Sequence, residues 1–550
     1  MCLYVVKIAG IVWMDRLVHR RRGFLRKVGG TATLAITGLP RLPSATARND
    51  DIIDFDGFPF SSDIFSLGVA SGDPLPESVV LWTRLAPDPL AKGGGLAEDR
   101  IPVHWRVATD PDMDRIVRAG TTPARPEDAH SIHVDVKGLE PATEYYYQFE
   151  AASERSPVGR TKTAPAAGTS PGTFEFAFVS CQNYPFGYYT PHRHLAEEEL
   201  DLVVHLGDYI YEGGAGGPLG RGHEPSTYCQ TLADYRTRHA QYKTDPALQA
   251  AHAVCPWIVT WDDHEVVNNY ADDEYRDVSS EALLRRRANA YQAYWEHLPL
   301  RPTRWPDGAD LPLYRRFTFG DLVEFNVLDT RQYRDDQPEC FGRELVDGYC
   351  PAALDSERTI LGDEQEQWLV EGLEDSTARW NVLAQQVIFA QTDDDRHPEE
   401  AEYARTGDKW DGYKADRDRL LEFMATNPDS NPVVITGDSH RNWVFDLKAD
   451  FSDSDSRTVG TEFAGTSLTS FGDGSGQTLY ADSQQYPVSD NPHQQFYNDD
   501  RGYVRCEITP DQWRTDFRVV STVEESRASV DTLASFAVEA GTPGAKRIPE

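Results

Sequence analysis

The stretch His205–Gly214, HLGDYIYEGG, constrains the fold more than any other part of the chain. It follows an apolar run made of Leu200, Leu202, Val203 and Val204, and it ends in two glycines. Such a run predicts a buried strand of a covered sheet, and the glycines predict the turn that leaves the sheet's carboxyl edge. Open α/β sheets bind ligands in the crevice beyond the carboxyl ends of their strands. Asp208 and Tyr211 are therefore expected to face a ligand.

Strand-like runs alternate with helical patterns throughout residues 173–520. The predicted strands are Phe174–Val179, Leu202–His205, Trp257–Trp261, Leu322–Asp329, Trp380–Leu383 and Pro432–Thr436. The predicted helices include Glu281–His297 and Gly362–Leu373. This alternation is typical of a layered α/β domain, and residues 521–550 are expected to form a C-terminal extension.

Residues 65–165 have a different pattern, with short runs in which apolar and polar residues alternate. Val79–Trp82, Val103–Val107 and Ile132–Val136 are separated by clusters of turn-forming residues. The pattern predicts an antiparallel β-sandwich. Leu139–Glu150 resembles the tyrosine-bearing strand of fibronectin-like domains. Because this region shows no acid, base or metal cluster, we expect it to be a scaffold.

Residues 1–47 have the features of a twin-arginine (Tat) signal peptide. Arg20–Leu25 has the twin-arginine form, a mildly apolar stretch follows at 28–39, and Ala45–Ala47 offers a small-residue cleavage site. An acidic linker at 48–64 would join the signal to the β-sandwich. We expect the Tat translocase to export the folded protein, which would then be extracellular or remain at the cell surface.

The chain is strongly acidic, with 89 Asp and Glu against 54 Lys and Arg and a net charge of −35. The negative electrostatic field of such a protein repels nucleic acid and anionic lipid, so we expect neither to be a partner. Only ten of the 54 basic residues are Lys, and the acids are scattered along the chain. A dispersed acidic surface low in Lys indicates a halophilic protein, whose self-repulsion molar salt would screen.

Seven cysteines are present, and six remain after removal of the signal. Cys340 and Cys350 flank a loop-like stretch and are able to pair outside the cell, as are Cys229 and Cys255. The sequence leaves this connectivity open. Neither CxxC nor HExxH occurs, so the standard zinc spacings are absent.

Four predicted strands end in polar clusters. These clusters are Ser180–Asn183, the pair Asp208 and Tyr211, Asp262–Glu265, and Gly437–His440. Any single cluster is explained as well by helix capping. Four of them at strand carboxyl ends predict one polynuclear metal site. Its expected ligands are Cys181, Asp208, Tyr211, Asp263, Asp438 and His440.

The donor types indicate which metals would bind. A Cys thiolate and a Tyr phenolate need a strongly Lewis-acidic cation, which favours Fe(III) over Mg(II) or Ca(II). The carboxylates of Asp263 and Asp438 suit harder divalent ions such as Ca(II), Mg(II) or Mn(II). Asp208 lies between the clusters in chain order and is the expected bridging carboxylate.

The motifs GDYIYE, WDDHE and GDSH, preceded by FVSCQNY, resemble those of the alkaline phosphatase D (PhoD-type) metallophosphatase family. Phe65–Leu85 also resembles the family's N-terminal domain, and the resemblance extends from about residue 60 to about residue 520. It implies a calcineurin-like β-sandwich flanked by helices. It also implies Fe(III) and Ca(II), with Mg, Mn or Zn possible at the divalent positions. Carried over by motif, the iron ligands are Cys181, Asp208, Tyr211 and His440, and the divalent ligands are Asp208, Asp263 and Asp438.

Five residues depart from the wider metallophosphatase pattern. Cys181 stands where most such enzymes place Asp, Asp263 replaces the usual Asn, and Asp438 replaces a His. Gln385 and Gln386 stand where a further His ligand is usual. The loss of nitrogen ligands shifts the second metal away from zinc.

These features predict an exported phosphohydrolase that cleaves phosphate mono- and diesters by attack of a metal-activated hydroxide. His264 is the candidate general acid, and the alternative is a His that orients Asp263. Arg331 is a candidate phosphate clamp, and the alternative is an ion pair with Asp329 or Asp335. Asn268 and Asn269 are expected at the rim of the site.

Two other functions remain open. One is a dedicated phosphodiesterase, including a phospholipase D-like activity, on the same scaffold. The other is a non-catalytic, metal-stabilised surface binding protein, which the complete set of proposed ligands disfavours. We expect small phosphate esters as substrates and a monomeric protein.

Overall fold

The computed structural model describes residues 63–549, except 98, 215, 339, 341–342, 394–402, 404–406, 454, 473–477 and 481–490. The described residues belong to one compact unit, Ile52–Glu550. The predicted signal peptide at 1–47, and the linker as far as residue 62, lie outside the described residues. No helix in the described part of the chain has the length and apolarity needed to span a bilayer.

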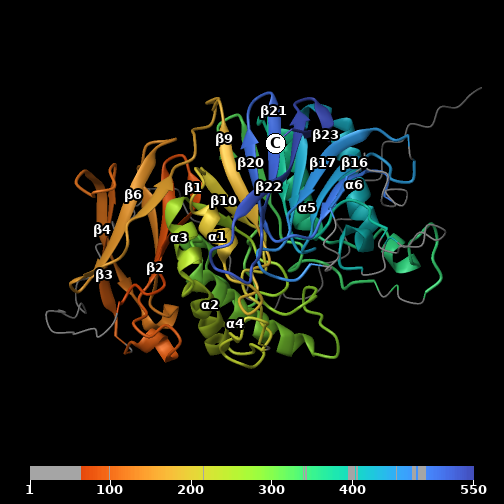
Figure 1. Cartoon of the computed structure of the whole chain (residues 1–550). Coiled ribbons are helices and arrows are strands. Elements are labelled where there is room, and N and C mark those ends of the chain that lie inside the picture. The colour runs from red at the N-terminus through yellow and green to blue at the C-terminus, as the bar shows by residue number, and fades with distance from the viewer. Residues whose placement is uncertain are drawn as a thin grey trace, which may run out of the picture. The chain divides into compact units, whose positions relative to one another are not determined.

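Within the described ranges the strands form three sheets (Figure 1). The ten-stranded sheet has the spatial order β23 (Thr542–Ile548), β22 (Val530–Glu539), β21 (Gln512–Val520), β20 (Gly502–Ile508), β9 (Phe174–Val179), β10 (Leu202–His205), β11 (Trp257–Val259), β1 (Val69–Leu75), β2 (Ser78–Arg84) and β5 (Ser131–Lys137). The eight-stranded sheet has the order β12 (Arg315–Phe319), β13 (Val323–Val327), β14 (Trp380–Ala384), β15 (Pro432–Thr436), β17 (Thr458–Ala464), β16 (Asn442–Lys448), β19 (Gln494–Asn498) and β18 (Thr478–Tyr480). The five-stranded sheet contains β4 (Ile116–Ala124), β3 (Ile101–Ala108) and β6 (Glu144–Ala151), with β7 (Glu154–Arg155) and β8 (Gly159–Lys162) both paired to β6.

All six predicted strands of residues 173–520 are confirmed, with small differences at their ends. The β9, β10 and β11 strands run parallel in one sheet. The β13, β14, β15 and β17 strands run parallel in the other. Parallel strands place their carboxyl ends at one edge, so the polar clusters that follow them are brought together.

The two large sheets pack face to face through an aromatic core. The Phe176 ring lies edge-on to Phe325 at 5.1 Å and to Trp513 at 5.6 Å between centroids. Successive residues of β9 alternate between this core and the opposite face of the sheet. Both faces are covered, which explains why the predicted strands are continuously apolar.

Helices cover the outer faces of both sheets (Figure 1). The helices α1 (Thr190–Leu195), α2 (Leu232–Lys243), α3 (Pro246–Val254) and α4 (Ser280–His297) pack on β9–β11. The helices α5 (Asp363–Asp375) and α6 (Lys414–Thr426) pack on the eight-stranded sheet. The α4 and α5 helices confirm the two predicted helices to within two residues.

The N-terminal strands form a sandwich that shares a sheet with the rest of the chain. The β1, β2 and β5 strands pack against the five-stranded sheet around a core that includes Val79 and Leu81 of β2. The β1 strand also pairs in parallel with β11, with Gly72 opposite Trp257. A Cβ atom at Gly72 would lie 2.7 Å from the Trp257 carbonyl oxygen, so glycine permits this close approach.

Residues 521–550 also contribute to the ten-stranded sheet. The β22 strand pairs with β21, and β23 pairs with β22. Phe536 and Val538 of β22 belong to the core between the two large sheets. Strand pairing and apolar burial thus join the predicted C-terminal extension to the domain.

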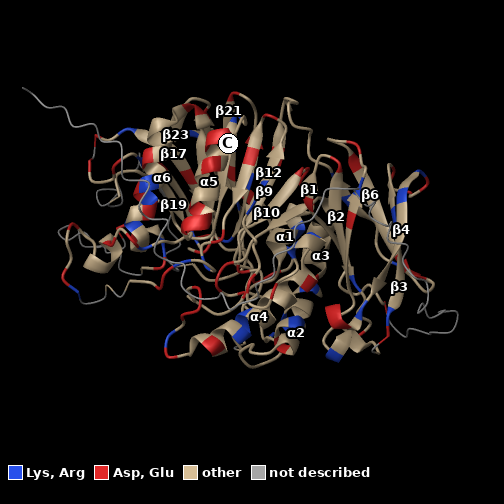
Figure 2. Ribbon diagram, turned by 180° about the vertical axis from the view of Figure 1, so that it is seen from behind, with Lys and Arg blue, Asp and Glu red and all other residues tan. Residues whose placement is uncertain are grey.

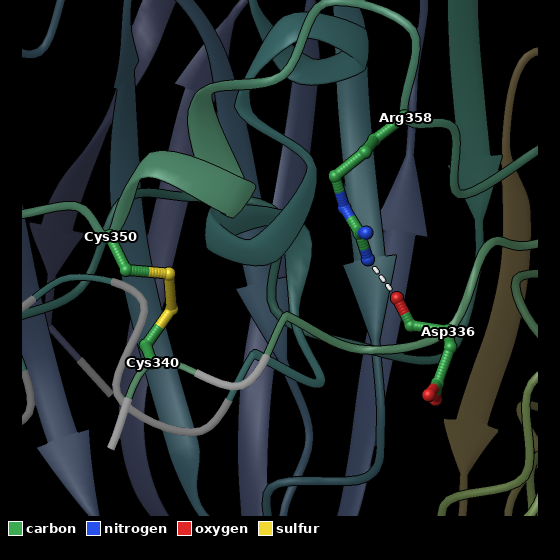
Figure 3. The surroundings of a disulfide bond; sticks show 4 residues. All are labelled: Asp336, Cys340, Cys350 and Arg358. Carbon is green, nitrogen blue, oxygen red and sulfur yellow. Dashed lines mark hydrogen bonds between the residues drawn. A yellow bond between two sulfur atoms is a disulfide. The ribbon is translucent and has the colours of Figure 1, made fainter. Parts of the chain in front are cut away.

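One of the two candidate cysteine pairs is confirmed. Cys340 and Cys350 form a disulfide, and Arg358 donates a hydrogen bond to the carbonyl of Asp336 nearby (Figure 3). The proposed pairing of Cys229 with Cys255 is wrong, since both are free and buried. Burial raises the pKa of each of these two thiols to about 12, so they are poor nucleophiles at neutral pH.

Acidic residues are spread over the helices, strands and loops of the described part of the chain (Figure 2). Some are balanced by nearby cations in exposed pairs such as Arg100–Glu127 and Arg285–Glu281. Exposed pairs of this kind contribute little stability. Adaptation to salt stays a prediction from this charge pattern.

Lys243, the last residue of α2, is 2% exposed. Its Nζ atom lies 4.1 Å from the ring centroid of Trp82 on β2 and 5.6 Å from that of Tyr209. No ion pair or hydrogen bond to this ammonium occurs among the described residues. Burial lowers its pKa from 10.5 to about 7. The charged form is therefore disfavoured in the folded state.

We expect Lys243→Met to stabilise the protein at low pH. The unfolded chain binds a proton more tightly than the folded chain, so the cost of burying Lys243 is full below pH 7 and disappears above its unfolded pKa. The free energy of unfolding should rise by about 2–5 kcal/mol at pH 6 and by less than about 1 kcal/mol at pH 10. Urea unfolding at both pH values measures this.

Lys162→Met is the matched control, because its half-buried ammonium pairs with Asp201 at 2.5 Å. That variant should be no more stable than the parent at either pH. An equal loss of stability in Lys243→Met at pH 6 and pH 10 would contradict the explanation.

Candidate metal centre

The predicted ligands lie at the carboxyl ends of strands from both large sheets. Cys181 follows β9, Asp208 follows β10, Asp263 follows β11, and Asp438 and His440 follow β15. The main-chain N–H of Cys181 donates to the carbonyl of Gly207 at 3.1 Å, which ties the first two strand ends together. A Cβ atom at Gly207 would lie 2.5 Å from the Cβ of Asp262, so glycine lets the second and third ends meet.

Four of the six predicted ligands have left-handed backbone conformations. The φ angles are 60° at Cys181, 55° at Asp208, 55° at Asp438 and 56° at His440. This region costs a non-glycine residue about 1–2 kcal/mol. Such strain concentrates at functional sites, where it aims side chains that a regular strand or helix would direct elsewhere.

Two groups of potential ligand atoms share Asp208. The ligand atoms of Cys181, Asp208 and His440 lie within 4.8 Å of one another, as do those of Asp208, Asp263 and His264. The phenol oxygen of Tyr211 lies 3.2 Å from Nε2 of His440, so Tyr211 adjoins the first group. Asp208 is therefore common to both groups, whereas Asp438, the third expected divalent ligand, belongs to neither, and His264 takes its place in the second.

His440 is oriented by a main-chain contact. Its Nδ1–H donates to the carbonyl oxygen of Phe471 at 2.6 Å. Burial lowers the pKa of His440 to about 4. The neutral ring then has its lone pair on Nε2, which is the nitrogen that a metal would use.

The acidic groups of the centre are costly to keep buried without a cation. Burial raises the pKa values of the Cys181 thiol, the Asp208 carboxyl and the Tyr211 phenol well above their usual ranges. Asp262 Oδ2 and Asp263 Oδ1 are buried without a hydrogen-bond partner in the described part of the chain. Thiol, phenol, carboxyl and imidazole donors gathered around unpaired oxygens fit bound metal ions.

Arg331 is fully buried among four carboxylates. Its Nε donates to Asp262, its Nη1 lies 2.7 Å from Asp408, and its Nη2 lies 3.3 Å from Asp438 and 3.8 Å from Asp263. Although burial opposes the shift, Arg331 lowers the pKa of Asp263 to about 2. Four hydrogen bonds to Asp262, Asp408 and Asp438 engage four of the five N–H donors of the guanidinium.

The ion-pair partners of Arg331 differ from the expected alternatives, Asp329 and Asp335. Asp329 accepts from the main-chain N–H groups of Arg331 and Gln332, both at 2.9 Å, and among the described residues it pairs with no guanidinium nitrogen of Arg331. Asp335 instead accepts from the main-chain N–H of Thr359 at 2.8 Å. The side chain extends into the centre because Asp262 and Asp438 lie there, and a second guanidinium, that of Arg334, shares Asp408 at 2.9 Å.

His264 pairs with a residue that the sequence reasoning missed. Its Nδ1–H donates to Glu212 Oε2 at 2.7 Å, and Glu212 also accepts from the main-chain N–H of Asn268 at 3.1 Å. Although burial opposes the shift, Asp208, Glu212 and Asp263 raise the pKa of His264 well above its usual range. Asp263 is oriented by the main-chain N–H of Asn269 at 2.7 Å rather than by His264.

Glu265 holds two of the strand ends in place. Its buried carboxylate accepts from the main-chain N–H groups of Asp208 at 3.2 Å, Asp262 at 2.8 Å, and Tyr209. The motif WDDHE contains this residue, but only the structure shows that it joins the β10 and β11 ends.

The segment Leu468–Phe471 was not predicted to belong to the site. Its main-chain N–H groups bond the carbonyls of Ser180 and Cys181, and Ser470 Oγ donates to the Tyr211 phenol oxygen at 2.7 Å. The segment follows β17, which pairs in parallel with β15. The sequence signal for this segment is the strand-like run Thr458–Ala464. Predicting that run as a strand would have placed the residues after it at the site.

Gln385 and Gln386, which replace the usual histidine, have structural roles. Gln386 accepts from the Thr330 hydroxyl at 2.7 Å and donates to Thr260 at 3.0 Å. Gln385 donates to Thr436 at 2.8 Å. Their amides therefore tie strand ends together.

This chain is similar to known proteins over nearly its whole length. The family model of PhoD-like phosphatases matches residues 176–517, and that of the PhoD-like phosphatase N-terminal domain matches residues 54–165. Alkaline phosphatase D of Bacillus subtilis (strain 168) is 49% identical over 537 residues, which are 96% of this chain and 89% of that protein. A solved structure of PhoD has a TM-score of 0.83 at 50% identity, covering 90% of this chain and 94% of that chain.

We expect Arg331→Met to destabilise the metal-free protein strongly. Removing the guanidinium leaves Asp262 and Asp263 buried without their cation, although Asp408 keeps Arg334, and breaking a buried pair costs about 3–5 kcal/mol. Urea unfolding in a chelator, at one fixed salt concentration, measures the loss. Added divalent cation should recover more stability in the variant than in the parent.

Arg285→Met is the control, because its guanidinium is 67% exposed and pairs with the exposed Glu281 at 2.5 Å. It should cost less than about 1 kcal/mol. Equal losses in the two variants would show that the buried carboxylates do not depend on Arg331.

Proposed function

Because the chain belongs to the PhoD-like phosphatase family, we propose that it is an exported, metal-dependent phosphohydrolase that releases phosphate from phosphate mono- and diesters. The observation that carries the proposal is the pair of ligand groups that share Asp208 at the carboxyl ends of the strands. The packing of two sheets between helices supports a calcineurin-like arrangement, and the strands of residues 65–165 support a fibronectin-like N-terminal domain.

In this proposal Cys181, Asp208, Tyr211 and His440 would hold Fe(III), as the first ligand group and the Tyr211–His440 contact support. Asp208 and Asp263 of the second group would hold Ca(II) together with Asp438, which the sequence pattern adds. Mg, Mn or Zn are alternatives at the divalent positions. The buried thiol and phenol, whose pKa values are raised, lose their protons only to a strongly Lewis-acidic cation. When bound, such metals supply Lewis acidity toward water and toward the phosphoryl oxygens.

His264 is the proposed general acid for the leaving oxygen. Glu212 holds the Nδ1 side of the ring, and Nε2 has no hydrogen-bond partner among the described residues. The carboxylates around the ring favour its protonated form, so Nε2 can hold a proton and donate it. Glu212 is a positioning residue in this proposal.

Arg331 is proposed to balance charge rather than to bind substrate. Its guanidinium keeps Asp262, Asp263, Asp408 and Asp438 close together in a buried site. Four carboxylates at this separation repel one another, and the cation offsets that repulsion. The arrangement preserves the oxygen donors for a divalent ion.

The remaining parts of the proposal rest on the sequence. The twin-arginine pattern supports export by the Tat translocase to the cell surface or the medium, and the acidic charge supports a halophilic protein that does not bind nucleic acid. The proposed substrates are small phosphate esters, and the protein is proposed to be a monomer. A dedicated phosphodiesterase, phospholipase D-like activity included, is the second candidate, since two metal ions held by these residues would serve both ester classes.

Comparing p-nitrophenyl phosphate with its bis-ester tests the function. The natively produced, metal-loaded protein at high salt should hydrolyse both, and a chelator should abolish both activities. A dedicated phosphodiesterase would largely ignore the monoester. Hydrolysis of neither ester would support the non-catalytic alternative.

Elemental analysis of the same preparation should find iron and calcium, and Cys181→Ala should remove the iron.

His264→Ala should slow esters with poor leaving groups more than p-nitrophenyl esters. General acid catalysis contributes about 10²–10⁴-fold, and p-nitrophenolate needs little protonation. The ratio of kcat/KM for phenyl phosphate to that for p-nitrophenyl phosphate should therefore fall about tenfold or more. Glu212→Gln should lower the same ratio less, because it leaves the imidazole in place.

The control is His104→Ala, on an exposed position of β3 that lies in the five-stranded sheet. It should leave the ratio unchanged. If His264→Ala slows both esters equally, the imidazole is not the general acid.

A further inference from the structure

Phe471 presents an exposed aromatic ring beside the metal centre. Phe471 is 53% exposed, and its carbonyl oxygen accepts a hydrogen bond from Nδ1 of His440 at 2.6 Å. The preceding residue, Ser470, donates to the Tyr211 phenol oxygen. The main chain of Phe471 is thus held against two proposed metal ligands while its ring stands at the rim.

Two other side chains complete the surroundings of this ring. Phe186, from the segment after Cys181, lies edge-on to Phe471 at 4.6 Å between centroids. The guanidinium carbon of Arg501 lies 6.0 Å from the Phe471 ring, and Arg501 Nε donates to the Ser470 carbonyl at 3.2 Å. No ion pair of Arg501 occurs among the described residues.

This group of residues has the chemistry of an aromatic binding surface. Two adjacent aromatic rings with a guanidinium beside them match the lining of ligand sites, which combine aromatic side chains with a few polar groups. Phenyl rings and a guanidinium both stack on planar heteroaromatic groups. The net charge of −35 disfavours polyanions, so the occupant is a small ester rather than a nucleic acid.

We propose that Phe471, Phe186 and Arg501 form a subsite for an aromatic or heteroaromatic substituent of the phosphate ester, such as a nucleoside base. The subsite rests on the proposed phosphatase function and names the class of substrate that the centre prefers. The phosphoryl group would lie at the proposed ligands, and the base would contact the Phe471 ring at the rim.

A matched pair of substrates tests the proposal. Adenosine 5′-monophosphate and ribose 5-phosphate share the same leaving alkoxide and differ by the base. For the metal-loaded parent protein, kcat/KM should be at least about fivefold higher for the nucleotide, since base stacking on an aromatic side chain is worth about a tenfold change or more. If only diesters are cleaved, thymidine 5′-(p-nitrophenyl phosphate) and ethyl p-nitrophenyl phosphate replace the pair.

In Phe471→Ala the preference should fall about fivefold, toward a ratio of one, whereas Phe471→Tyr should retain it. Trp305→Ala is the control, because Trp305 is 43% exposed and packs edge-on to Trp295 away from the centre. It should keep the parent ratio. Equal kcat/KM values for the two substrates in the parent, or an unchanged ratio in Phe471→Ala, would overturn the subsite while leaving the phosphatase function intact. Hydrolysis of no phosphate ester would reject both.

Discussion

The buried carboxylates around Arg331 are the constraint on which the centre depends. Asp262, Asp263 and Asp438 come from two sheets, and Asp408 comes from a loop. Their mutual repulsion would separate the strand ends if no cation lay between them. The guanidinium, with Arg334 beside it, holds them within reach of one another. The same repulsion makes the group a strong attractor for a divalent ion, so charge balance and proposed metal binding have one physical origin.

The backbone around the centre also keeps the proposed ligands close together. Glu265 accepts from N–H groups on both the β10 and β11 ends, and Gly207 lets these ends approach closely. Left-handed conformations at Cys181, Asp208, Asp438 and His440 direct the side chains inward. Strain of this kind persists only when surrounding structure over-determines it. The covered sheets, with aromatic packing between them and helices outside, supply that rigidity.

Many of the strands and helices were predictable, because the spacing of apolar residues within a segment indicates which of its faces are buried. The runs at Phe174–Val179 and Leu202–His205 are apolar on both faces, and both are central strands. Polar residues directly after such strands then indicated Asp208 and His440, which the structure brings together. Partners distant in sequence were not predictable. Nothing distinguishes Asp408 from the other acids near it, and Arg331 pairs with residues up to 107 positions away.

The sequence by itself determined which segments are buried strands, which residues follow them and which family the motifs resemble. Those properties depend on neighbours within a few positions along the chain. Tertiary structure alone decided that residues 521–550 extend the main sheet, that Cys229 and Cys255 stay apart, and that Arg331 faces carboxylates rather than solvent. Strand pairing and ion pairing across sheets depend on distances between remote segments, and no local pattern encodes them.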